Sequence, residues 1–97
     1  DMRLSPCVKI INTLNKVHKK NISVCDPHAD FKKSNLSKNI KPVKIKELYD
    51  RGNIYDILII LNSHNIFDLK EIVKKCKIVI DVVNSCRNIK HKKIIKI

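Results

Sequence analysis

Glycine, aromatic residues and arginine are all scarce in this chain of 97 residues. With Gly52 as its only glycine, the chain cannot form a Gly-x-Gly-x-x-Gly dinucleotide-binding turn. Its aromatic residues, Phe31, Tyr49, Tyr55 and Phe67, form no stripe on which nucleic-acid bases could stack. There is no apolar run long enough to cross a membrane, and the amino terminus lacks the apolar segment of a secretory signal. We therefore expect no membrane insertion and a cytoplasmic location.

The formal charge is +12 at pH 7, but its distribution argues against a dedicated nucleic-acid surface. Lysines are spread through every segment, whereas Arg3, Arg51 and Arg87 are the only arginines. Arginine is the better reader of phosphates and bases, because its planar guanidinium donates two parallel hydrogen bonds. We interpret the charge as general solvation of a basic surface. Of the three functional hypotheses that the sequence allows, a small nucleic-acid-binding protein is therefore the one it supports least; the other two follow below.

The cysteines are predicted to be reduced thiols, because no secretory signal points to an oxidising compartment. There are four of them: Cys7, Cys25, Cys76 and Cys86. Cys25-x2-His28 and Cys86-x4-His91 resemble metal half-sites, but the chain lacks the Cys-x2-Cys pair typical of structural zinc sites. No cysteine has a histidine at a spacing typical of a catalytic pair. We predict neither a metal site nor a catalytic residue.

The amino-terminal half predicts one helix and two short strands. Ser5-Pro6 is a good helix start, and apolar residues at spacings of three and four continue to about Lys20. Residues 22–25 predict a strand that Asp26-Pro27 ends. Residues 28–42 predict a loop and residues 43–45 a second strand, and a helical turn over residues 47–51 is predicted to end at Gly52 as its C-terminal cap.

Residues 55–84 are the most informative part of the chain and predict a strand–loop–helix–strand unit. Residues 57–61 are apolar on both faces, which is typical of a central parallel strand. Asp68 is the predicted N-cap of a helix over residues 69–76, with Glu71 in the capping-box position. Residues 78–80 predict the next strand. After a charged spacer over residues 90–93, residues 94–97 predict the last one.

This order of elements predicts a three-layer α/β fold with a mostly parallel sheet, in one domain spanning residues 1–97. Such domains usually open on the strand that becomes central, whereas this chain opens on a helix. We therefore predict that a first strand is missing, and that the chain is a fragment which is marginally stable or self-associates through the gap. Ligands of open parallel sheets bind outside the carboxyl ends of the strands. Residues 62–65 and Asp81 stand there, and Asp81 either faces a ligand or forms a turn.

Four segments give the chain a resemblance to one enzyme family. They are Asp1–Pro6 (Asp-x-Arg-x-Ser-Pro), Ile22–His28 (a strand ending in Asp-Pro), Ser63–Asp68 (His-x-x-Phe-Asp) and Ile78–Asn84 (a strand ending in Asp-Val-Val-Asn). In this order and at this spacing they resemble the C-terminal, UDP-binding domain of the UDP-glucose/GDP-mannose dehydrogenase family, over essentially the whole chain. The residues of the last two segments most resemble those of the UDP-N-acetylglucosamine 6-dehydrogenase branch.

The resemblance implies a Rossmann-like domain that holds the nucleotide end of a UDP-sugar. In the intact enzyme, N-terminal domains bind NAD and dimerise, and the sugar C6 alcohol is oxidised to a carboxylate with NAD as cofactor. Arg3 would reach the NAD, because a guanidinium pairs with phosphate or ribose oxygens; an exposed or capping arginine is the other interpretation. Asn84 and His64 would bind the substrate, and for His64 a solvated or helix-capping role in its loop stays open.

Several features depart from the family. Its nucleophilic cysteine lies upstream of this domain and is not in the chain. The strand bearing Phe-Lys that precedes the Asp-x-Arg-x-Ser-Pro segment in the family is not in the chain either. Val83 stands where the family has a substrate-facing arginine, and Arg87 lies four residues further on. The isolated chain is thus expected to bind a nucleotide sugar without catalysis. The alternative is a degenerate Rossmann-like module that binds a nucleotide or a protein partner and belongs to no catalytic assembly.

Overall fold

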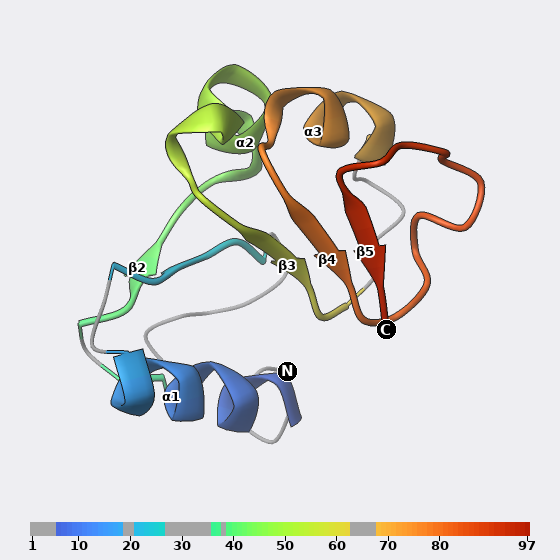
Figure 1. The fold of residues 1–97 in the computed structure, drawn as a ribbon. Helices are drawn as coiled ribbons and strands as arrows, with labels where there is room; N and C mark the ends of the chain where they lie inside the picture. Colours follow the sequence, from blue (N-terminus) through green and yellow to red (C-terminus); the bar gives the residue numbers. More distant parts are fainter. Residues whose placement is uncertain (1–5, 19–20, 27–35, 38, 63–67) are drawn as a thin grey trace. The chain divides into compact units, whose positions relative to one another are not determined.

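The computed structural model describes residues 6–18, 21–26, 36–37, 39–62 and 68–97 (Figure 1). The chain divides into two compact units, Asp1–Ile45 and Lys46–Ile97. Each unit combines helix with parallel strands: β1 pairs with β2 in the first, and the order is β3-β4-β5 in the second. The predicted α/β fold with parallel sheet is therefore confirmed, with its strand pairs distributed over two sheets.

The first unit contains α1 (Pro6–His18), β1 (Ser23–Val24) and β2 (Lys41–Pro42). The helix is the one predicted, and its buried residues Val8 and Ile11 are three apart on one face. Asn15 is also buried, and its side-chain amide exchanges two hydrogen bonds of 3.0 Å with the amide of Asn39. A fully paired amide costs little to bury, so this pair ties α1 to the segment that leads into β2.

The predicted strand over residues 43–45 is wrong, because β2 lies two residues earlier and Ile45 begins a helix. The amides on either side of Pro42 donate to the carbonyls of Ile22, just before β1, and of Val24, with N···O distances of 3.0 and 2.9 Å. Pro42 itself faces the opposite edge of the ladder, where a missing N–H removes no hydrogen bond. The predicted loop over residues 28–42 is therefore wrong at its end, where Lys41 and Pro42 form β2: proline is excluded only from strands that are paired on both sides.

The second unit holds α2 (Ile45–Arg51), which starts at the boundary, a 3-10 helix η3 (Gly52–Ile54), β3 (Leu58–Ile60), α3 (Leu69–Lys75), β4 (Val79–Asp81) and β5 (Ile94–Lys96). Figure 1 shows β3, β4 and β5 side by side. The three predicted strands are therefore confirmed to within two residues at each end, and the helix over residues 69–76 to within one.

Side chains alternate across the β3-β4-β5 sheet, as the pleat requires. One side of the sheet is buried. It carries Ile60 and Val79, whose side chains are 7% and 0% exposed. The other side is made of isoleucines that are 38–51% exposed. We call it the isoleucine face: Ile57, Ile59, Ile78 and Ile95. The sheet therefore packs its core on one side only within the described residues.

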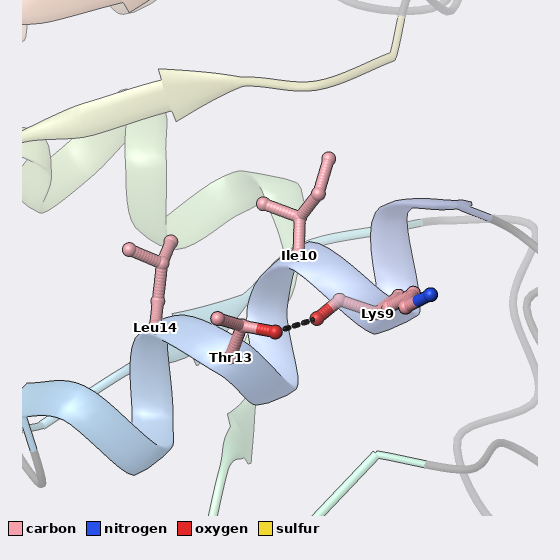
Figure 2. Close-up of a pocket in the computed structure, with 4 residues that line it drawn as sticks. All are labelled: Lys9, Ile10, Thr13 and Leu14. Atoms are coloured by element: carbon pink, nitrogen blue, oxygen red, sulfur yellow. Dashed lines mark hydrogen bonds between the residues drawn. The ribbon is translucent and has the colours of Figure 1, made fainter.

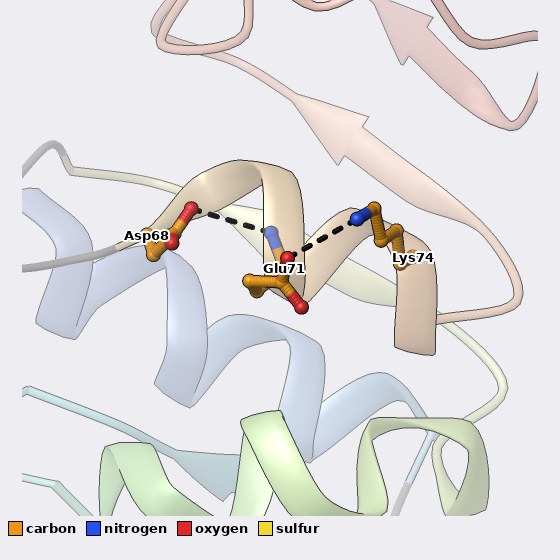
Figure 3. A network of polar contacts seen from close by, with 3 residues as sticks. All are labelled: Asp68, Glu71 and Lys74. Carbon is orange, nitrogen blue, oxygen red and sulfur yellow. Dashed lines mark hydrogen bonds and ion pairs between the residues drawn. The ribbon is translucent and has the colours of Figure 1, made fainter.

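Helix α3 begins at the predicted cap. The Asp68 carboxylate accepts a hydrogen bond from the Glu71 amide at 3.4 Å, and the Glu71 side chain pairs with Lys74 at 3.2 Å (Figure 3). Glu71 does not complete the capping box. The Asp68 amide instead donates to the Tyr49 hydroxyl of α2 at 2.8 Å, so a tertiary contact replaces the local one.

The end of α3 is capped by a lysine seventeen or more residues away in the sequence. The Lys93 ammonium donates to the carbonyls of Val73 and Cys76 at 2.7 and 2.8 Å, and more distantly to Lys74 at 3.4 Å. These carbonyls are at the C-terminal turn of α3, where acceptors lack intrahelical partners and the helix dipole is negative. Lys93, predicted only as part of a charged spacer, therefore also caps α3.

Gly52 directly follows α2, as predicted, but not with the expected conformation. Its φ is not positive, and the chain continues into η3. A Cβ atom built on Gly52 would lie 3.1 Å from both Cys76 Sγ and Lys75 Cβ. The glycine is therefore needed for the close approach of η3 to α3 rather than for a left-handed cap.

We predict that Lys93→Met lowers the free energy of unfolding by about 2 kcal/mol, because it keeps the aliphatic stem but leaves helix-end carbonyls without a charged donor. Urea denaturation followed by circular dichroism measures this. Lys92→Met removes the same charge from an exposed neighbouring position and should change the unfolding free energy little. Equal losses in the two variants would show that the Lys93 contacts contribute nothing.

Candidate functional site

The carboxyl ends of β3, β4 and β5 lie at one edge of the sheet. Ile60, Asp81 and Lys96 are in register there, and the Val82 amide donates to the Ile60 carbonyl at 3.2 Å. Exposed polar residues follow these strand ends or belong to them. We call them the carboxyl-edge residues: Asn62, Asn84, Arg87 and Lys96. This is the edge at which ligands of parallel α/β sheets bind.

Asp81 forms a turn and does not face a ligand. Its side chain is 1% exposed, and its two carboxylate oxygens accept hydrogen bonds from the amides of Ser85 and Cys86 at 3.0 and 2.7 Å. Backbone donors thus satisfy a buried charge that would otherwise be costly. Of the two predicted roles for Asp81, the turn is confirmed, and the carboxylate holds the loop after β4 in one shape.

Asn84 stands in the loop that Asp81 holds. Its φ is 59°, and within the described residues no other non-glycine residue has a positive φ. Asparagine tolerates this left-handed conformation better than most residues. Its side chain is exposed at the carboxyl edge, so the predicted binding residue is presented to solvent. The sequence signal for it, an asparagine just past a strand end, predicts the turn as well as the ligand role.

Two other predicted site residues, Arg3 and His64, lie outside the described residues. Val83 is 42% exposed, so an apolar side chain reaches solvent at the position where the resemblance implies an arginine. Lys96 was not predicted. It comes to this edge because β5 pairs in parallel with β4, and it lies close enough to counteract part of the rise in the pKa of Cys86. Only the register of the sheet identifies it.

The cysteines are not arranged as nucleophiles. Burial raises the pKa of the thiols of Cys25, Cys76 and Cys86, and the Asp81 carboxylate raises that of Cys86 further. Cys76 and Cys86 are 3% and 0% exposed. A nucleophilic cysteine needs a lowered pKa and access to substrate, and these two buried thiols have neither. They act as small core residues, and none of the four cysteines forms a disulfide.

A shallow hollow of about 360 Å³ lies along α1, lined by Lys9, Ile10, Thr13 and Leu14 (Figure 2). The Thr13 hydroxyl already donates to the Lys9 carbonyl at 2.8 Å. A single helix face with its hydroxyl committed to the backbone offers little that could recognise a ligand.

The chemistry of the carboxyl edge is therefore that of binding. Amides and cations can hold an anionic, hydrogen-bonding ligand such as a phosphate ester. Across the part of the chain that the structure describes, no three histidine, cysteine or acidic side chains gather as a metal site would require. The helices found among those residues are too short or too polar to cross a bilayer.

Comparison with known proteins gives one match. Residues 1–88 match the model of the UDP-glucose/GDP-mannose dehydrogenase family, UDP binding domain. No curated protein and no solved structure matches the chain. The match covers the first unit and residues 46–88 of the second, and it includes the loop after β4 that carries Asn84. β5 and Lys96 lie beyond it.

We predict that Asn84→Gly leaves the free energy of unfolding within about 0.5 kcal/mol, whereas Asn84→Ala lowers it by about 1 kcal/mol, because alanine resists a φ of 59°. Chemical denaturation of both variants checks this. Asn88→Ala, at an exposed position of the same loop without positive φ, is the matched control and should be neutral. Equal effects of glycine and alanine at position 84 would contradict the conformational role.

For the thiols, we predict that Cys76 and Cys86 in the folded chain react with iodoacetamide at least about tenfold more slowly than in the urea-unfolded chain. Burial limits access, and a raised pKa leaves less thiolate near neutral pH; the rate should climb as the pH rises toward that pKa. Peptide mass spectrometry of the alkylated protein resolves each cysteine. Equal rates in folded and unfolded protein would contradict the buried positions.

Proposed function

Because the chain belongs to the UDP-glucose/GDP-mannose dehydrogenase family, as its UDP-binding domain, we propose that it binds a UDP-sugar at the carboxyl edge of the β3-β4-β5 sheet. The match over residues 1–88 carries this proposal. The edge supports it, because exposed amides and cations collect there and suit a sugar nucleotide's hydroxyls and phosphates.

Three of the carboxyl-edge residues have a role in this proposal. Lys96 and Arg87 attract the diphosphate, and the Asn84 amide hydrogen-bonds to the nucleotide sugar. His64, in the segment after β3, contributes a further contact to the same ligand, and Arg3 reaches across to the cofactor of the intact enzyme. Asp81 does not touch ligand in this scheme; it positions Asn84 through the Ser85 and Cys86 amides.

For the longer enzyme, the proposal is NAD-dependent oxidation of the sugar C6 alcohol to a carboxylate, with UDP-N-acetylglucosamine as the substrate. Residues 1–97 are then one domain of a cytoplasmic enzyme. The described residues do not fit the pyrophosphate of NAD, because Gly52 is packed against α3 and no glycine-rich turn surrounds it. This domain therefore serves the nucleotide sugar, and the hydride acceptor belongs to another part of the enzyme.

The alternative is a degenerate Rossmann-like module that binds a nucleotide or a protein without belonging to a dehydrogenase. Val83 favours it, because a valine that is 42% exposed replaces the cationic contact expected at this edge. Both candidates bind through the same residues, and both leave the isolated chain inactive.

We predict that isothermal titration of the 97-residue chain detects UDP with a Kd on the order of micromolar to millimolar, and uridine at least about tenfold more weakly. The difference reflects the contact of the diphosphate with Lys96 and Arg87. Asn84→Gly should weaken UDP about tenfold without loss of stability, since it deletes the side-chain amide but accepts the same φ.

Two lysine-to-glutamine variants test whether the position of the positive charge matters for UDP binding. Lys96→Gln should weaken UDP, while Lys70→Gln, which removes the same charge from an exposed position on α3, should not. Equal effects would show that only net charge attracts the nucleotide. An absence of heat with UDP up to millimolar concentration would sink both nucleotide-binding interpretations.

A further inference from the structure

The hydroxyl of Ser85 differs from the other buried polar groups in the described part of the chain. Its Oγ atom is closed off from solvent and has no hydrogen-bond partner, a condition that no other buried side-chain oxygen or nitrogen of the described residues shares. The buried polar residues Asn15 and Asp81 are both paired. Because an unpaired buried hydroxyl lowers stability, folded proteins keep few of them, and each one needs an explanation.

Ser85 lies in the loop that the proposed ligand site uses. It directly follows Asn84 and stands two residues before Arg87, and both of these neighbours are exposed. Lys96 is in register with Asp81, whose carboxylate accepts the Ser85 amide at 3.0 Å, so this lysine belongs to the same end of the sheet. The unpaired hydroxyl is therefore surrounded in the chain and in the sheet by the residues proposed to hold the nucleotide.

The hydroxyl can reach the carboxyl edge without a change in the loop. Ser85 as a whole is partly exposed, although its oxygen is not. A serine side chain has three staggered positions about its Cα–Cβ bond, and no hydrogen bond holds the Ser85 hydroxyl in its present one. The backbone bonds from Ser85 and Cys86 to Asp81 fix the loop and do not involve the hydroxyl, so they stay intact when it rotates.

A serine hydroxyl at this place suits an anionic oxygen. It can donate one hydrogen bond, and donation to a phosphate oxygen is stronger than donation to a neutral acceptor, because the acceptor is charged. Arg87 and Lys96 are exposed, long and flexible, so they attract a phosphate without fixing its position. The short side chain of Ser85, on a loop that Asp81 holds, adds a contact of defined direction.

We infer that Ser85 is a further ligand-binding residue of the carboxyl edge, whose hydroxyl donates a hydrogen bond to a phosphate oxygen of the UDP-sugar. The inference rests on the proposed function and adds to it a residue that recognises the diphosphate. The free chain carries the cost of an unpaired hydroxyl, and the bound nucleotide supplies the missing acceptor.

Ser85→Ala separates this role from a structural one. Alanine removes the unpaired oxygen and keeps Cβ, so the thermal unfolding midpoint of the variant without ligand should stay the same or rise. In isothermal titration the same variant should bind UDP about tenfold more weakly. Uridine, which has no phosphate, should bind the variant and the unaltered chain equally. A serine with a purely structural role would instead lower the unfolding midpoint.

Thr13→Val is the matched control, because it removes a hydroxyl that is already paired with the Lys9 carbonyl on α1. It should leave the affinity for UDP unchanged. The inference is overturned by a lower unfolding midpoint of Ser85→Ala, by an unchanged affinity of this variant for UDP, or by an equal loss for uridine or in Thr13→Val. An absence of heat when UDP is added to the unaltered chain overturns the proposed function as well, so the two failures are distinguishable.

Discussion

The contact between the Lys93 ammonium and the end of α3 is the constraint on which the second unit depends. Lys93 is the residue before β5, and its own carbonyl accepts the Val79 amide at 3.0 Å, so one residue joins the helix end, β4 and the start of β5. A charge-assisted bond to orphaned helix carbonyls is among the stronger polar contacts available near a surface. It places the entry of β5, and the parallel register that follows brings Lys96 beside Asp81.

From that register the carboxyl edge acquires its chemistry. Both carboxylate oxygens of Asp81 accept hydrogen bonds from backbone amides, and these bonds hold the loop in place. Asp81 is therefore not available as an acid, a base or a ligand for cations. The loop it holds presents Asn84, while the Cys86 thiol beside it is buried and has a raised pKa. An edge with exposed cations and amides, but with its carboxylate and its one thiol buried, is suited to hold an anionic ligand rather than to transform it.

The lysines of this chain have several different structural roles, although they are spread evenly through the sequence. Lys93 caps a helix, Lys96 stands at the carboxyl edge of the sheet, and Lys74 pairs with Glu71 on the exposed side of α3. Of these lysines, only Lys96 belongs to the proposed ligand site. The family match agrees with a phosphate-bearing ligand at this edge.

Local signals determined the elements of this protein. The three- and four-residue spacing of apolar residues predicts α1 and α3, the uncharged runs predict β3 and β4, and Asp68 marks the start of α3, because each signal acts within a few residues. The order of motifs also identified the family. Tertiary structure alone decided the roles of Lys93, Pro42 and Gly52, since each depends on which distant atoms approach it. Long-range pairing leaves no periodic trace in the sequence, and this is why a lysine in a charged run proved to be a helix cap.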